Sequence, residues 1–436
     1  MPSITFGQAY RPGEAWPKIG YSSFVRTADY ANAAFREDAA RTRAEPTGGG
    51  AIALMGTGEQ RTSGWMRGAS AWNMVGNNAI AAPLALSGRT HDLWTTPHGV
   101  IKAALANQPR VRMRSDGERT LAAVSFEVPG QYRATALING AGMVEQIESV
   151  QPNPVMGDTR STIRFSEYRD VGGIRFPMRI QQNMGGHPVL DLAVMDVKVN
   201  AVAAIEIPPA VPVFAERVVT EKAADGVWFL AGGSHNSVAI EMADHVIVVE
   251  SPLYDDRSAP MLAQARALAG GKPVRFVINS HHHFDHSGGL RAAVAEGAVL
   301  VTSALARPWF ETVLANPNRI APDAMRRSDR SATVTGVDGK RIFTDGQRVV
   351  EVHDIRDGVH ANGFLMVYLP RERLLIEADA YTPLPPNAAP PSKPNGNNVN
   401  LVENIERLGF QVDHILPLHG RMVPVADLST PVGRKR

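Results

Sequence analysis

Histidine and aspartate residues gather in one short segment of the sequence, NSHHHFDHSGG, at positions 279–289. Because side chains alternate along an extended chain, His281, His283 and Asp285 are expected to point to one side. His286 follows at the turn into a predicted helix, so it approaches from another direction. Neutral imidazoles and carboxylates are the ligands that zinc and similar divalent ions accept when thiolates are absent. The segment therefore predicts a metal site, and its spacing suits ligands around two adjacent ions.

The composition excludes several other chemistries. The 436-residue chain contains no cysteine, which rules out a disulfide framework, a cysteine nucleophile and a thiolate-bound metal centre. The chain has 45 Lys and Arg residues and 43 Asp and Glu residues, so its formal net charge is +2. This near-neutral charge gives no electrostatic reason to expect nucleic acid or a membrane surface as partner. No apolar run approaches the roughly 18–20 residues that span a bilayer. We therefore expect a small-molecule substrate, and the oligomeric state stays open.

Two predicted elements position the histidine segment. VRFVINS at 274–280 predicts a buried strand and GGLRAAVAEG at 288–297 a short helix, so the histidines occupy a strand-end loop. Such loops are where α/β domains usually place reactive groups. The surrounding mixture of apolar runs and helical patterns predicts a layered α/β domain. Its other expected strands are 226–232, 237–242, 245–250, 298–303, 347–354, 363–369, 373–378 and 413–417, and its other expected helices are 255–271 and 400–408.

The first half of the chain has a different pattern. Apolar and polar residues alternate with a period of two, which is typical of antiparallel strands with one covered face. The prolines of IEIPPAVP at 205–212 predict an extended connector. We therefore predict an antiparallel β-rich α+β domain at 1–207, a linker at 208–217 and a second domain at 218–436. The expected strands of the first domain are 3–10, 120–128, 131–138, 143–150, 161–168, 173–184 and 188–200, with one helix at 92–107.

The run His281-His282-His283-Phe284-Asp285-His286 resembles the HxHxDH motif of the metallo-β-lactamase-fold hydrolases, a superfamily with an αββα sandwich and usually two metal ions. The resemblance covers about residues 218–428 and implies three further ligands in order, each at a strand end. GVHANGFLMVYLPRERLLIEADAY supplies His360 and Asp379, and ILPLHG supplies His419. By this resemblance, the first ion is held by His281, His283 and His360, the second by Asp285, His286 and His419, and Asp379 bridges the two.

The resemblance also implies a mechanism. Two divalent ions roughly 3.5–4 Å apart repel each other, and a shared carboxylate and a shared hydroxide offset that repulsion. The hydroxide attacks a carbonyl or phosphoryl centre, and it is available at neutral pH because the pKa of the bound water falls to about 7. Asp285 and Asp379 are the expected catalytic residues, and Tyr381 is a candidate to donate a hydrogen bond to a developing oxyanion. His282 is expected to face away from the ions. His235 is interpreted as a turn residue, with a place in the lining of the cleft as the alternative.

Several activities of the superfamily are compatible with this ligand set. Its β-lactamases usually lack an aspartate at the bridging position, so Asp379 weighs against a dedicated β-lactamase. His283 weighs against the diiron oxygen-reducing relatives, which carry glutamate there. We expect a hydrolase of an ester, lactone, thioester or amide bond, with zinc as the ion and iron or manganese as alternatives. Two other interpretations stay open: a β-lactamase-like amide hydrolase, and a non-catalytic binding or carrier protein with a relict metal site.

The N-terminal half carries a second, weaker resemblance. Residues 167–200 resemble the repeated antiparallel strands of a lipoprotein-carrier-like half-barrel, a module found ahead of metallo-hydrolase domains in exported bacterial proteins. This implies a periplasmic protein whose leader is absent from the chain, with cytoplasmic residence as the alternative. Two irregular segments, 315–332 and 382–400, are rich in Pro, Asn, Gly or charge and are interpreted as surface loops, either of which could wall the active site.

Overall fold

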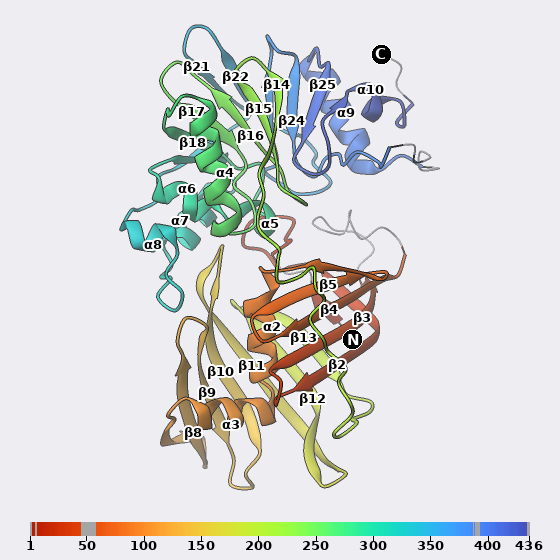
Figure 1. Ribbon diagram of the computed structural model, residues 1–436, viewed down its shortest axis with the longest axis vertical. Helices are drawn as coiled ribbons and strands as arrows, with labels where there is room; N and C mark the ends of the chain where they lie inside the picture. The colour runs from red at the N-terminus through yellow and green to blue at the C-terminus, as the bar shows by residue number, and fades with distance from the viewer. Residues whose placement is uncertain (1, 5–6, 45–57, 387, 389–392, 434–436) are drawn as a thin grey trace.

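The computed structural model describes residues 2–4, 7–44, 58–386, 388 and 393–433 of the chain. The chain folds into two β-rich domains that are stacked along the long axis of the molecule (Figure 1). The N-terminal domain, red to yellow, contains one large sheet, and the C-terminal domain, green to blue, contains two smaller ones. No helix in these described residues has the length and apolar character that a membrane crossing requires.

Within the described residues, the N-terminal domain contains a single sheet of 13 antiparallel strands. Two meanders, β2 to β6 and β7 to β13, are joined by the short strand β1, which pairs with both β2 and β13. The strands are β1 (Pro2–Ile4), β2 (Lys18–Asp29), β3 (Ala34–Arg43), β4 (Gln60–Arg67), β5 (Ser70–Val75), β6 (Asn78–Ala81), β7 (Arg110–Asp116), β8 (Arg119–Val128), β9 (Tyr132–Ile138), β10 (Val144–Asn153), β11 (Gly157–Val171), β12 (Ile174–Met184) and β13 (His187–Ala193).

Two helices, α2 (Ala85–Trp94) and α3 (Pro97–Ala106), pack on this sheet through apolar residues. The helix expected over 92–107 is confirmed in its second half as α3, while residues 92–94 belong to the separate helix α2. Pro97 begins α3 and holds the preceding Thr96 in an extended conformation, with ψ at 161°, so the helical path is interrupted there. Thr96 then caps α3 by accepting a hydrogen bond from the Gly99 backbone N–H at 3.1 Å.

The strands expected from residue 120 onward correspond to β8 through β13, although β13 ends at Ala193. The period-two pattern is clear in β11, where Ile163 and Phe165 are buried and their neighbours are more exposed. The meander β2 to β6 was not predicted. Among the described residues, the strand expected at 3–10 is limited to β1, and Gly7–Tyr10 forms no strand; residues 5 and 6 lie outside them.

Residues 194–218 connect β13 to the C-terminal domain without a helix or strand, and they include the stretch expected as the linker. Part of this connector packs on the N-terminal sheet, because Ile205 and Val211 share a small buried cluster with Ala34 and Trp72. The expected domain limits, 1–207 and 218–436, remain a prediction.

The C-terminal domain is a sandwich of two sheets with helices on both outer faces, so the αββα expectation is confirmed (Figure 1). One sheet, in the order β14 to β20, is antiparallel up to β17 and parallel from there on. Its strands are β14 (Val219–Ala224), β15 (Val227–Ala231), β16 (Ser237–Glu241), β17 (Val246–Val249), β18 (Val274–Ile278), β19 (Val299–Ser303) and β20 (Val334–Val337). The other contains β21 (Lys340–Thr344), β22 (Val349–Asp354), β23 (Leu365–Leu369), β24 (Leu374–Glu377), β25 (His414–Pro417) and β26 (Val423–Pro424).

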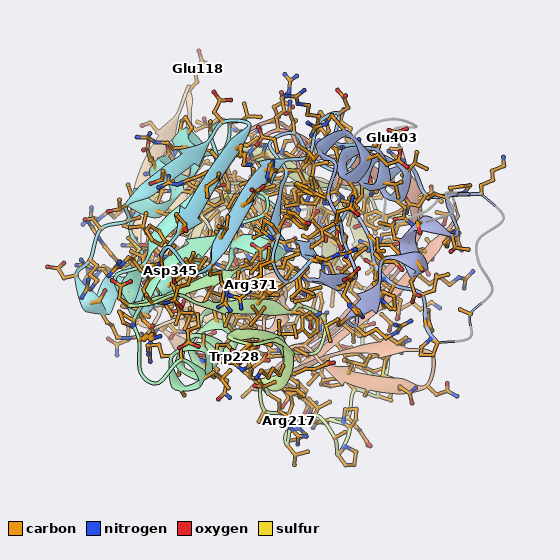
Figure 2. The ribbon with its side chains drawn as sticks, turned by 90° about the horizontal axis from the view of Figure 1, so that it is seen from above. Glu118, Arg217, Trp228, Asp345, Arg371 and Glu403 are labelled. Atoms are coloured by element: carbon orange, nitrogen blue, oxygen red, sulfur yellow. The ribbon has the colours of Figure 1, made fainter. Side chains whose placement is uncertain are left out.

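Apolar side chains of both sheets form the main core, in which Ile247 of β17 and Val352 of β22 are completely buried. The outer face of the seven-stranded sheet is covered by helices from the middle of the chain, and the six-stranded sheet is covered by the last two. Viewed from above, Trp228 of β15 and Glu403 of α9 lie on opposite sides of this domain (Figure 2). The helices are α4 (Asp255–Leu268), α5 (Phe284–Ser287), α6 (Leu290–Ala295), α7 (Arg307–Ala315), α8 (Ala324–Ser328), α9 (Gly396–Leu408) and α10 (Ala426–Ser429).

The turn between β10 and β11 docks on the C-terminal domain. Val155 in this turn is buried and packs in the cluster beneath α4, α6 and α7. The Asp158 N–H donates to Pro317 O at 2.7 Å, and the Asp158 carboxylate accepts from the N–H groups of Arg319 and Ile320. The segment 315–332 therefore joins the two domains, and it also contains α8. In the other segment interpreted as a loop, 382–400, the last residues belong to α9, while residues 387 and 389–392 lie outside the described ones.

Candidate metal centre

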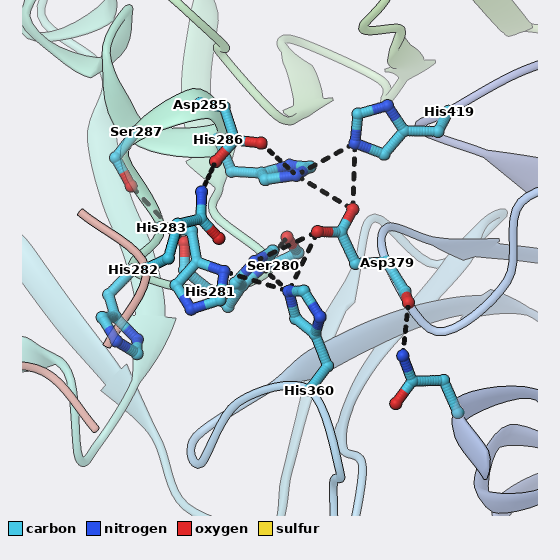
Figure 3. A network of polar contacts seen from close by, with 12 residues as sticks. Ser280, His281, His282, His283, Asp285, His286, Ser287, His360, Asp379 and His419 are labelled. Atoms are coloured by element: carbon cyan, nitrogen blue, oxygen red, sulfur yellow. Dashed lines mark hydrogen bonds and ion pairs between the residues drawn. The ribbon is translucent and has the colours of Figure 1, made fainter. Parts of the chain in front are cut away.

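The seven side chains expected to bind metal converge at one edge of the sandwich, where strands of both sheets end (Figure 3). Parallel pairing of β17 with β18 and of β24 with β25 brings the carboxyl ends of these strands to the same edge. The histidine segment follows β18, Asp379 follows β24 and His419 follows β25, while His360 lies in the loop before β23.

The histidine segment is shaped by its contacts with the loop that follows β17. His283 has an extended conformation, and α5 begins immediately after it. The Asp285 carbonyl accepts a hydrogen bond from the Leu253 N–H at 2.9 Å. A Cβ atom on Gly288 would overlap the Leu253 carbonyl, so the close approach of these two loops requires glycine at this position.

The first group of ligands is completely buried. His360 Nε2 lies 3.1 Å from His281 Nε2 and 3.0 Å from His283 Nδ1. Asp379 Oδ2 lies 2.9 Å from the same His360 nitrogen. The ligand atoms of these four residues all lie within 4.8 Å of one another. Neutral imidazole nitrogens at such distances would bring lone pairs together, and a cation between them removes that repulsion.

The second group is partly open to solvent. His286 Nε2 and His419 Nε2 are 3.2 Å apart, and Asp285 Oδ2 lies 3.7 Å from the His286 nitrogen. His235 also belongs to this group, with its Nε2 atom 3.3 Å from Asp285 Oδ2. The expectation that His235 is only a turn residue is therefore incomplete: it lies in the turn between β15 and β16, but that turn faces the other three side chains.

Asp379 lies between the two groups. Its Oδ2 atom faces His360, and its Oδ1 atom lies 2.9 Å from His419 Nε2 and 3.1 Å from His286 Nε2. Both oxygens are buried and neither has a conventional hydrogen-bond partner within the described part of the chain. A buried carboxylate is stable only when it is paired or coordinates a metal, so these two oxygens fit cations on both sides.

Outer hydrogen bonds select which nitrogen of each imidazole faces the centre. The Glu250 carboxylate, completely buried, accepts from His286 Nδ1 at 3.3 Å and from Ser280 Oγ at 2.6 Å. Because the serine hydroxyl donates to Glu250, its oxygen accepts from His281 Nδ1 at 2.9 Å. His419 Nδ1 donates to the Ser234 carbonyl at 2.8 Å. In these three rings the Nδ1 atom is thus occupied by an outer partner and the Nε2 atom faces Asp379, which is the arrangement that metal-binding histidines adopt.

The protonation states agree with metal binding. Burial lowers the pKa of His281 and His283 well below the usual imidazole value, and the neighbouring imidazoles lower it further. These rings are neutral at neutral pH, as metal ligands must be. Burial opposes the charge on Asp379, but His286 and His360 outweigh it and hold the pKa of Asp379 well below its ordinary value. In the second group, burial opposes the charge on His286, but the Asp379 and Asp285 carboxylates raise its pKa well above the usual imidazole value, so this ring must lose its proton when a metal ion binds. Two groups of imidazoles that share one carboxylate fit divalent metal ions.

Two other predicted residues have different surroundings. His282 points away from the two groups, as expected, and burial lowers its pKa to about 4. Tyr381 is buried in the core between the sheets, where burial raises its pKa to about 12, and its backbone N–H donates to Glu377 Oε2 at 2.9 Å. Among the described residues, the Tyr381 hydroxyl forms no hydrogen bond with any of the seven ligands. Its role at an oxyanion stays a prediction.

Sequence reasoning missed Glu250, Ser280 and the N-terminal residues Gln8 and Ala9, all of which contact the metal ligands. Glu250 had a usable signal, because it is a charged residue that directly follows an apolar strand, β17. Gln8 and Ala9 had none, because they precede the histidine segment by more than 270 residues.

Comparison with known proteins gives one family match and several similar solved structures. Residues 230–386 match the family model of the metallo-beta-lactamase superfamily, a stretch that includes six of the seven predicted ligands and ends before His419. Among solved structures, the chain is similar to a metallo-beta-lactamase from Pontibacter korlensis, with 17% identity over 49% of this chain and 96% of that chain and a TM-score of 0.37. It is also similar to the metallo-beta-lactamase FIM-1 from Pseudomonas aeruginosa in its mono-zinc form, with 18% identity over 49% of this chain and 92% of that chain and a TM-score of 0.36. A flavoprotein from Thermotoga maritima is similar with 15% identity over 50% of this chain and 61% of that chain and a TM-score of 0.38. No curated protein matches the sequence.

Proposed function

With a C-terminal domain of the metallo-β-lactamase fold as the premise, we propose that this protein is a dinuclear metal-dependent hydrolase of small molecules. The first ion is held by His281, His283 and His360, the second by Asp285, His286 and His419, and Asp379 is shared. His235 adds a further nitrogen to the second group. Zinc is the proposed ion, because imidazole and carboxylate donors suit it, and iron or manganese would use the same ligands.

The position of Asp379 is the observation that carries the proposal. A carboxylate that served one ion would need only one oxygen near imidazole nitrogens. Here Oδ2 lies 2.9 Å from a nitrogen of the first group and Oδ1 lies 2.9 Å from a nitrogen of the second. One residue thus contacts both groups, as a bridging ligand does in two-metal hydrolases.

Divalent ions bound in these groups supply a lowered pKa for water and polarise the oxygen of a scissile bond. The chain's own residues orient this chemistry. Glu250 holds His286 directly and His281 through Ser280, so one ring in each group keeps its Nε2 atom toward Asp379. Asp285 and His419, the more exposed members, lie on the side from which a substrate can approach. We propose an ester, lactone, thioester or amide as the substrate, since the formal net charge of +2 favours no polyanion.

The proposal is tested on the full-length protein by metal analysis and by hydrolysis assays. Two divalent ions per chain after purification under metal-replete conditions, together with turnover of at least one class in a panel of lactones, esters, thioesters and β-lactams, is the expected result. Fewer than two ions in metal-replete protein contradicts the dinuclear site. Two bound ions with no turnover of any acyl substrate contradicts the proposed reaction and favours a binding protein.

A further inference from the structure

The N-terminal segment Gly7–Tyr10 leaves its own domain and lies against the metal ligands of the other one. The Ala9 carbonyl is 2.9 Å from His282 Nε2 and 2.9 Å from His283 Nε2, and Ala9 is only 2% exposed. In Figure 3, the red N-terminal ribbon passes beside His282 and His283. These contacts join residues of the first β-domain to the loop that follows β18.

The Ala9 carbonyl determines which nitrogen of His283 is available to a metal. A carbonyl oxygen can only accept, so His283 Nε2 carries the hydrogen and donates. The lone pair of the ring is then on Nδ1, the atom that lies 3.0 Å from His360 Nε2 in the first group. The orientation of a ligand in the first group is thus set by a backbone atom of the N-terminal segment.

Gln8 acts on the second group in the same way. Its Nε2 atom donates to Asp285 Oδ1 at 2.8 Å, and Gln8 is 8% exposed. This bond occupies one carboxylate oxygen and leaves Oδ2 toward His286 Nε2. Because a side-chain amide N–H is neutral, it orients the carboxylate without removing the negative charge that a cation needs.

The segment is anchored on the loop that carries His360 as well. The Tyr10 carbonyl accepts from the Asn362 N–H at 2.8 Å, and the Tyr10 hydroxyl donates to the Gly358 carbonyl at 2.9 Å. At the other end, Gly7 has φ of +71°, and a Cβ atom there would overlap the ring of Phe284. The segment therefore fits closely between two ligand-bearing loops, and only glycine is accommodated where it passes Phe284.

We propose that Gln8 and the Ala9 carbonyl are positioning groups of the metal centre, so that the N-terminal domain completes the active site instead of being an independent module. This inference rests on the proposed metal centre. We therefore expect that the first domain is needed for tight metal binding. We also expect that Gln8 affects the ion of the second ligand group and the Ala9 carbonyl that of the first.

Gln8→Met is the sharpest test, because methionine is close to glutamine in size but lacks the amide N–H. Competition with a chelator should show that the affinity for one of the two ions falls by about 10- to 100-fold, the usual cost of losing an outer hydrogen bond to a metal ligand, while the other ion is held as before. Arg11→Ala is the matched control, since Arg11 directly follows the segment and its exposed side chain forms an ion pair with Glu14. The metal affinity of this variant should be unchanged.

Gly7→Ala is the second variant, because it should displace the whole segment and lower the affinity for both ions. Far-UV circular dichroism should confirm that this variant is folded. The cobalt(II)-substituted variants add a readout that a purely structural effect would not move, because altered ligand geometry changes the visible absorption of the ion. Wild-type affinities and spectra in Gln8→Met overturn the role of Gln8, and the same result in folded Gly7→Ala overturns that of Ala9. Wild-type protein that binds two ions without hydrolysing any substrate contradicts the proposed reaction only, and wild-type protein without ions contradicts both.

Discussion

The two groups of metal ligands differ in how they are enclosed. Every member of the first group is buried, and Asp379 and three histidines from two loops surround its centre. In the second group, the side chains of Asp285 and His419 keep 24% and 15% of their surface exposed. The first group is therefore a closed set of donors, and the second faces solvent on one side.

This difference separates two tasks that one ion would otherwise combine. Closed sites with protein donors on all sides hold a metal tightly, and sites with an open position admit water or substrate. The shared Asp379 connects the groups, and Glu250 touches both through His286 and Ser280. Under the proposed dinuclear centre, we therefore expect the first ion to anchor the centre and the second to face the side of substrate entry.

The largest effect is expected from Asp379→Ala. Loss of the shared carboxylate removes a ligand from both groups and leaves two sets of imidazoles facing each other, so turnover should fall by about 10³-fold or more. Metal analysis should show loss of at least one ion per chain. His283→Ala should also abolish turnover, through the first group alone. The N-terminal sheet should keep its far-UV circular dichroism in both variants, and undiminished turnover in both would contradict the dinuclear centre.

A chelator should remove the ions of the two groups at different rates. A chelator reaches the exposed second group first, so dialysis is expected to remove one ion rapidly and the other at least about tenfold more slowly, as buried ligands must open before they exchange. Inductively coupled plasma analysis of samples taken during dialysis gives the two phases. His419→Ala should abolish the fast phase and keep the slow one. A single phase for both ions would remove the distinction drawn here.

Four of the seven central side chains lie in the histidine segment, whose residue types and position after a strand predict a metal site. The other three, His360, Asp379 and His419, were named through the resemblance to the metallo-β-lactamase-fold hydrolases. The pattern of apolar residues predicted most strands of the sandwich. It failed on β2 to β7. In β2, Ile19 is the one residue of the strand that is buried and most others are half-exposed, and in β7 every residue is exposed. Without a covered face, the period-two signal of a strand is absent.

What surrounds the ligands was less predictable than the ligands. His235 lies next to Gly232 and Gly233, and its sequence context is that of a turn; only the approach of β15 and β16 to the histidine segment brings it to Asp285. Gln8 reaches the same carboxylate from the other domain. Such contacts depend on the tertiary path of the chain and leave no local pattern in the sequence.

A smaller effect is expected from Glu250→Gln, which tests whether the two groups share their outer support. Glutamine keeps the size of the side chain but has only one accepting oxygen, so it cannot serve His286, Ser280 and Asn279 together. The expected cost is about 10- to 100-fold in metal affinity, and it should fall on both ions. Competition titrations of both ions measure it, with Glu241→Gln, at a half-buried ion pair to Lys272 outside the metal centre, as control. An effect confined to one ion would show that the groups are supported independently.

The smallest effect is expected at His235, and it decides how many donors the second group has. With Asp285, His286, His419 and Asp379 still present, His235→Ala should weaken only the second ion, by about tenfold. His235→Cys gives a direct test of ligation because the chain has no other cysteine. If His235 binds the ion, cobalt(II) in this variant should show thiolate-to-metal charge-transfer absorption, which wild-type protein lacks. If the absorption is absent while two cobalt ions are bound, His235 is only a hydrogen-bond partner of Asp285. The second group then has four protein donors when the shared Asp379 is included, as the first group does.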